Sequence, residues 1–226
     1  MIAKIENELF SLQDIPYKEF QSTLIPTLPK DQIIGVRVPQ LRAFAKKLCG
    51  RKDFDAFLRS LPHTYYEENM LHAFCIADIT DFNACICETE RFLPYIDNWA
   101  TCDSFRPRCF ARHKQELLPH IRRWIHSPHP YTVRFAMEML MVHYLEESFS
   151  EEYPAMVAAV RSNEHYVNMM AAWYFATALA AQKEHILPYF AEKRLSPDVL
   201  PKAIRKALES YRIDAATKDL LRRTSK

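Results

Sequence analysis

Apolar residues recur three or four positions apart along almost the whole chain, and no low-complexity linker interrupts this pattern. Such spacing is typical of amphipathic helices and not of strands, which alternate every second residue. The pattern therefore predicts an all-α protein. Its predicted helices cover residues 17–28, 54–61, 64–77, 82–93, 99–112, 115–126, 130–147, 151–163, 165–182, 184–193, 197–213 and 215–223, with one more beginning at Pro39.

Polar residues and prolines mark the expected helix starts. A proline is tolerated in the first helical position because the missing N–H would have no partner there. We therefore expect helices to begin at Pro39, Pro130 and Pro197, with Ser196 as the cap of the last. We expect caps at Asp53 and Asp81, and a capping box formed by Thr64 with Glu67.

The predicted helices form pairs of nearly constant length. The pairs begin near residues 64, 99, 130, 165 and 197, which are 35, 31, 35 and 32 residues apart. This spacing is typical of two-helix repeats that stack into an arched solenoid. We therefore expect a single repeat domain over residues 1–226, with a compact helical bundle as the alternative.

Composition excludes several kinds of site. The chain has only two glycines, Gly35 and Gly50, so neither a Gly-rich phosphate loop nor a dinucleotide fingerprint can occur. Its six cysteines form no CxxC pair, and its nine histidines show no metal-ligand spacing. We expect reduced thiols, a cytoplasmic protein, and no metal or cofactor. The longest apolar stretch, Tyr166 to Ala181, is too short for a membrane span.

The net charge of +2 is unevenly distributed. Residues 1–100 carry −3, residues 101–134 carry +5, residues 135–192 carry −6 and residues 193–226 carry +6. Such segregation is typical of a protein that presents a basic face to a polyanion, although solvated helix surfaces are the alternative. Two clusters of basic residues are the expected contacts to the phosphates of a polyanion: Arg106, Arg108, Arg112 and Lys114 in the first, and Lys202, Arg205, Lys206 and Arg212 in the second.

Four residues fall at related offsets in successive repeats. Asp103 and Arg134 both lie four residues after a pair start, Trp99 lies at a start, and Trp173 lies eight residues after one. Side chains at equal offsets in stacked repeats project side by side, so we expect two indoles, a carboxylate and a guanidinium to share one face. That set suits a flat cationic ligand. The alternatives are a tryptophan core and an ion pair between Asp103 and Arg134.

The sequence resembles the bacterial AlkD-type DNA alkylation repair proteins from about residue 15 to residue 215. The resemblance rests on the segments Gly35–Arg42, Tyr95–Phe105, Val133–Ala136, Ala172–Tyr174 and Lys202–Tyr211. It implies HEAT-like repeats bent into a C-shape that holds duplex DNA on its concave side. It also implies metal-independent glycosylase activity on positively charged N3- and N7-alkylated purines, without insertion of a flipped base into a deep pocket.

The resemblance also assigns roles to individual residues. Asp103 would be the catalytic carboxylate, Trp99 and Trp173 the aromatic walls, and Arg134 the cation that binds the DNA backbone or orients Asp103. The expected partner is double-stranded DNA with alkylated bases, bound by a monomer.

Two departures from the family pattern keep a second reading open. Phe20 stands where characterised members carry a tyrosine, and Tyr174 to Ala176 stand where they carry charges. Some branches of the family bind DNA without excising bases. A non-catalytic protein that binds distorted or branched DNA is therefore the alternative, and a helical-repeat scaffold for protein partners is a third reading.

Overall fold

The computed structural model describes residues 2–224, and these residues form α-helices, short 3₁₀ helices and connecting loops without any strand. The all-α prediction is therefore confirmed. The chain divides into two compact units, the first ending at His113 and the second beginning at Lys114. Each unit is described by itself below. The expected single domain and its C-shape stay predictions.

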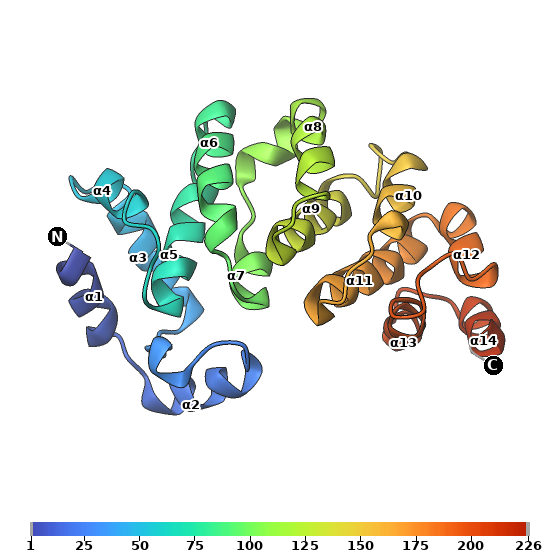
Figure 1. Ribbon diagram of the computed structural model, residues 1–226, viewed down its shortest axis with the longest axis horizontal. Coiled ribbons are helices and arrows are strands. Elements are labelled where there is room, and N and C mark those ends of the chain that lie inside the picture. Colours follow the sequence, from blue (N-terminus) through green and yellow to red (C-terminus); the bar gives the residue numbers. More distant parts are fainter. Residues whose placement is uncertain (1, 225–226) are drawn as a thin grey trace. The chain divides into compact units, whose positions relative to one another are not determined.

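The helices of the first unit are α1 (Ile2–Ser11), α2 (Ile15–Leu24), η1 (Lys30–Gln32), α3 (Val38–Leu48), α4 (Phe54–Leu58), α5 (Tyr66–Ala77), α6 (Phe82–Phe92), η2 (Leu93–Tyr95), α7 (Trp99–Ser104) and η3 (Arg108–Arg112). Here α5 packs against α3, α6 and α7, so it has neighbours on several sides (Figure 1). Every residue of α5 is buried, which explains why its apolar positions show little amphipathic pattern.

The helices of the second unit are α8 (Lys114–Trp124), α9 (Pro130–His143), α10 (Glu152–Ala159), α11 (His165–Ala181), α12 (Lys183–Ala191), α13 (Leu200–Glu209) and α14 (Ala215–Thr224). In this unit α11 packs between α9 and α13 (Figure 1). Helix α8 packs against α9, helices α10 and α12 pack against α11, and helix α14 packs against α13. Alternate helices thus form a row that the intervening helices cover, as expected for two-helix repeats. No helix in the described part of the chain is both long and apolar enough to cross a bilayer.

The predicted helix over residues 99–112 is wrong. The structure breaks it into α7 and η3, with Phe105 in an extended conformation between them. Pro107 is the physical reason, because its ring disfavours a helical residue before it and its nitrogen has no hydrogen to donate. The break places Arg106 on an extended connector, which we call the α7–η3 connector.

Some helix starts are confirmed. Asp81 caps α6, since its Oδ1 accepts a hydrogen bond from the backbone N–H of Ala84 at 2.7 Å. Pro130 is the first residue of α9 as predicted. Pro39 lies in the first turn of α3, one residue after its start at Val38.

Other starts differ from the prediction. Asp53 precedes α4 without capping it, because its carboxylate is hydrogen-bonded to Arg51 at 2.6 and 2.8 Å. Pro197 does not begin a helix: the Ser196 carbonyl oxygen accepts from the N–H groups of Val199 and Leu200, and this turn delays the start of α13 to Leu200.

The capping box was assigned to the wrong pair. Glu68, not Glu67, accepts from the N–H groups of Thr64 and Tyr65 at 3.0 and 2.9 Å. The Glu67 carboxylate instead reaches the loop before α3, where it accepts from the N–H groups of three successive residues, Ile34, Gly35 and Val36, at 2.7–3.1 Å.

Glu67 is fully buried, and desolvation by this burial raises its pKa even though the three N–H groups favour the charged form. Gly35 makes the loop possible, with a φ of +96° and no room for a Cβ. This loop connects α2 to α3, so it fixes where α3 starts relative to α5.

Candidate functional site

Trp99 and Asp103 lie on the same side of the short helix α7. The Asn98 side chain begins this helix by accepting a hydrogen bond from the N–H of Thr101 at 2.8 Å. Thr101 and Cys102 face the core with no exposed surface, whereas Trp99 and Asp103, four residues apart, are both partly exposed. The two predicted site residues of α7 therefore share a partly exposed face.

The indole of Trp99 is held by another helix. Its Nε1 donates a hydrogen bond to the carbonyl oxygen of Leu24, the last residue of α2, at 3.0 Å. The bond satisfies the only polar group of the ring and fixes the ring's orientation against the end of α2.

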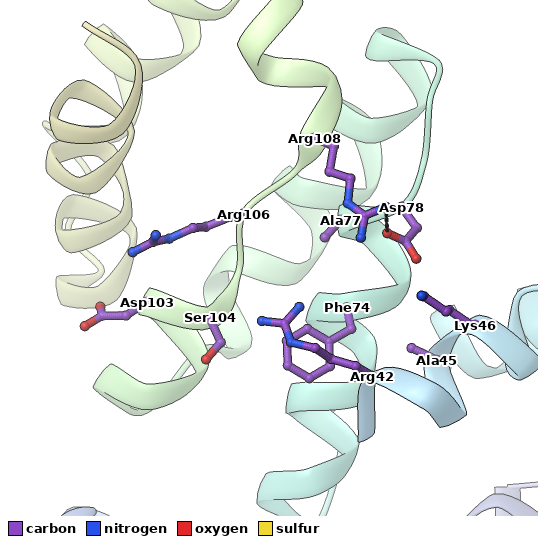
Figure 2. A pocket seen from close by; sticks show the side chains of 10 residues that line it. All are labelled: Arg42, Ala45, Lys46, Phe74, Ala77, Asp78, Asp103, Ser104, Arg106 and Arg108. Carbon is purple, nitrogen blue, oxygen red and sulfur yellow. Dashed lines mark ion pairs between the residues drawn. The ribbon is translucent and has the colours of Figure 1, made fainter. Parts of the chain in front are cut away.

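Asp103 also borders a pocket of about 400 Å³. Figure 2 shows Asp103 and Arg106 at one end of this pocket, Arg108, Asp78 and Lys46 at the other, and Arg42 between them. We call it the α3–α5 pocket, and it is lined by Arg42, Ala45 and Lys46 of α3, Phe74 and Ala77 of α5 with Asp78 after it, Asp103 and Ser104 of α7, Arg106 and Arg108. Four cations against two carboxylates make the pocket electropositive and suited to an anion.

Arg108 and Asp78 form an ion pair across this pocket, with 3.2 Å between Nη1 and Oδ1. The Arg108 side chain is 72% exposed, so the pair is screened by water and worth about 0–1 kcal/mol. An anion that binds in the pocket can therefore replace Asp78 as the partner of Arg108 with little loss of free energy.

Arg42 is positioned by an aromatic ring. Its guanidinium carbon lies 4.1 Å from the centroid of the Phe74 ring, and Figure 2 shows the two side by side. Phe74 belongs to the buried helix α5 and is only 3% exposed, so it is a rigid platform.

The first predicted basic cluster is divided by the structure. Arg106 and Arg108 line the α3–α5 pocket, while Arg112 ends η3 as an exposed residue outside it. Lys114 begins α8 in the second unit, where its Nζ donates to the hydroxyl of Ser148 at 3.1 Å.

Arg134 and Trp173 belong to the second unit. Arg134 lies on α9 with only 4% of its surface exposed, and its Nη1 donates to the carbonyl oxygen of Tyr166 at 2.6 Å. Trp173 is partly exposed on α11, while the neighbouring Tyr174 and Phe175 are fully buried. That all four predicted residues share one face stays a prediction.

Trp173 borders a smaller pocket of about 240 Å³ within the second unit. Its other charged lining residues are Lys206 and Glu209 of α13 and Arg212 just beyond this helix. Lys202 and Arg205 lie on α13 outside the pocket lining, and the Lys202 Nζ donates to the carbonyl oxygen of Asp198. The second predicted basic cluster is therefore also divided, because α13 ends before Arg212.

Sequence reasoning missed Arg42, Lys46, Phe74 and Asp78. A signal for the first two existed, since Arg42 and Lys46 are four residues apart on α3 and point away from its buried residues Leu41 and Leu48. Their role is visible only with the pocket, because Phe74 of α5 and Asp78 just after this helix lie about 30 residues further along the chain.

Comparison with known protein families identifies one match. A family described as DNA alkylation repair enzyme matches residues 5–210, which is most of the chain. A search among curated proteins found no match.

Proposed function

Because the chain belongs to the DNA alkylation repair enzyme family, which supports a role in DNA repair, we propose that it is a DNA glycosylase for positively charged N3- and N7-alkylated purines in duplex DNA. One observation carries this proposal. The Asp103 carboxylate lies at the rim of an electropositive pocket, on the same partly exposed face of α7 as Trp99.

The chemistry needs a carboxylate but no general acid. An alkylated purine is already cationic, so when the bond between its nitrogen and C1′ breaks, the electron pair leaves with the base and makes it neutral. The sugar becomes an oxocarbenium-like cation. An ionised Asp103 stabilises that cation electrostatically and orients the water that adds to C1′ and then loses a proton.

Trp99 supplies an aromatic face for the cationic base. A cation near an indole gains about 0.5–2 kcal/mol, and the hydrogen bond to Leu24 keeps the ring in one orientation. The family resemblance supports Trp173 as a second aromatic wall and Arg134 as the cation that binds backbone or orients the carboxylate. We propose that the protein acts as a monomer and without a metal or cofactor.

The decisive experiment replaces Asp103→Asn. We expect release of 7-methylguanine from methylated duplex DNA to fall by at least about 100-fold, because the amide cannot stabilise a sugar cation. Duplex affinity and the unfolding midpoint should remain close to those of the wild type. The measurements are chromatographic detection of free base, anisotropy with a labelled duplex, and urea unfolding.

Asp78→Asn is the matched control, since this carboxylate lines the same pocket but pairs with Arg108. It should retain most of the activity. Equal losses in both variants, or loss of folding together with activity in Asp103→Asn, would show that Asp103 is structural.

A second candidate function is binding of distorted or branched DNA without excision. The arrangement of cations favours it independently of Asp103, because the α3–α5 pocket of the first unit and the Trp173 pocket of the second would attract phosphates without any catalytic carboxylate. Wild-type protein that binds duplex in a salt-sensitive way but frees no base would favour this function over the first.

A further inference from the structure

We propose that the α3–α5 pocket is a phosphate subsite that binds one diester phosphate of a DNA strand, with Arg42 and Lys46 as its principal ligands. This inference rests on the proposed DNA-binding function and gives a role to two residues to which neither the charge clusters nor the family resemblance assigned one. Both residues come from α3, whereas Asp103 comes from α7.

The charges of the pocket favour an anion. Arg108 pairs with Asp78, but Arg42 and Lys46 have no carboxylate partner among the residues that the structure describes. Like charges four residues apart on a helix destabilise it by about 0.2–0.5 kcal/mol. A phosphate bound between them would remove this repulsion.

The guanidinium of Arg42 is positioned to bind a phosphate. The contact of its guanidinium carbon with the Phe74 ring, 4.1 Å from the centroid, limits the positions that the group can take. Two parallel N–H donors match two phosphate oxygens, so little side-chain entropy is lost when the phosphate binds. Lys46, one turn further along α3, adds a second charge without a fixed direction.

The pocket suits a sugar–phosphate backbone better than a base. Among the residues that the structure describes, Phe74 is the only aromatic one that lines the pocket, and Arg42 already lies against that ring, so no second described ring is offered for a base to stack on. Its volume of about 400 Å³ and its open, polar lining accommodate a phosphate with part of the adjoining sugar.

The phosphate subsite also bears on the proposed catalysis, because the pocket includes the carboxylate. Ser104 and Asp103 line the same pocket as Arg42 (Figure 2). A strand that leaves its phosphate on Arg42 therefore continues past Asp103, so the subsite holds the strand in register with the carboxylate.

The test compares Arg42→Gln with Arg59→Gln, an exposed arginine of the same unit that lies outside the pocket lining. Anisotropy with an undamaged labelled duplex is measured between 50 and 300 mM salt. We expect Arg42→Gln to weaken binding at least about 5-fold and to reduce the slope of log K against log salt by about 0.9, the value for one lost phosphate contact. Arg59→Gln should leave both quantities unchanged.

Lys46→Gln provides a second variant, because its side chain is exposed and its removal leaves the contact between Arg42 and Phe74 in place. It should lower the same slope. If both pocket variants behave like Arg59→Gln, the phosphate subsite is overturned.

Two further measurements identify the source of the phosphate and separate this inference from the proposed function. Inorganic phosphate and thymidine 5′-monophosphate are titrated as competitors of the duplex. Competition at micromolar concentrations would overturn the assignment to a DNA strand, while competition only at many millimolar supports it. Wild-type protein that frees no 7-methylguanine but still shows the Arg42-dependent salt slope would contradict the glycosylase and support the subsite.

Discussion

The surroundings of a guanidinium decide its role, as Arg42 and Arg134 illustrate within their separate units. Arg42 is exposed and lies on a buried ring, so its donors are available to an anion. Arg134 is almost fully buried and gives a donor to the carbonyl oxygen of Tyr166, so it also serves to join α9 to α11. Truncating it would remove this hydrogen bond between the two helices, so a loss of function there would need a stability control.

Cys49 is a second side chain whose chemistry depends on a neighbour. A hydrogen bond donated by the Cys75 thiol lowers the pKa of Cys49 to about 7. Its thiolate therefore predominates above pH 7, and we expect alkylation by iodoacetamide to rise with a midpoint near that pH. The measurement is the rate of Cys49 modification, followed by mass spectrometry of peptides across pH 5–10.

The control for Cys49 is Cys75→Ala, which removes the donor. The midpoint should then move up to about 8 or higher, the ordinary range of a cysteine thiol. An unchanged midpoint would contradict the role of Cys75.

At the scale of elements, helices whose signals are local could be predicted well. Asp81 and the apolar period after it place α6, and Pro130 places the start of α9, because both signals act within one turn. The shared face of Trp99 and Asp103 could also be predicted, since it needs only their spacing of four residues.

Features that depend on distant residues could not be predicted in this way. Glu67 was expected to cap its own helix, but its partners lie in a loop more than 30 residues earlier. The contact of Arg42 with Phe74 likewise joins two helices and has no local signal. The break at Pro107 was predictable in principle, because the steric rule for the residue before a proline is local.

The loop before α3 gives a prediction at this scale. Gly35→Ala should lower the free energy of unfolding by about 2 kcal/mol or more, because a positive φ costs about 1–3 kcal/mol for a residue with a Cβ. The added Cβ would also stand 2.6 Å from the Cβ of Lys18 and 2.7 Å from the carbonyl oxygen of Asp14. Urea unfolding measures the loss.

Gly50→Ala is the natural comparison, since a Cβ there meets only the carbonyl oxygen of Lys47 at 3.9 Å and the backbone has no positive φ. This variant should match the wild type within about 0.5 kcal/mol. Equal effects at both glycines would show that the loop is not constrained as described.

At the scale of the whole molecule, a net charge of only +2 conceals two strongly basic segments. Affinity for a polyanion then depends on where cations gather and not on the total charge. In the second unit, two of these cations, Lys206 and Arg212, line the same pocket as Trp173.

The pocket of the second unit can be tested by replacing both of its cations. We expect Lys206→Gln with Arg212→Gln to reduce the salt slope of duplex binding by up to about 1.8, the value for two lost phosphate contacts. Arg205 lies on α13 like Lys206 but outside the pocket lining, so Arg205→Gln should reduce the salt slope less for each charge removed. An equal effect per charge would indicate a diffuse basic surface in place of a pocket.

The hydrogen bond between Trp99 and the end of α2 has a practical consequence. The orientation of the indole is set by α2, whose last residue, Leu24, lies 75 residues earlier in the chain, and α2 also carries the exposed side chains of Phe20 and Leu24. If the proposed glycosylase function holds, the range of adducts should therefore change when α2 is diversified and α7 is left intact. Randomised libraries of α2 would then alter the proposed aromatic wall, Trp99, without replacing the proposed catalytic carboxylate, Asp103.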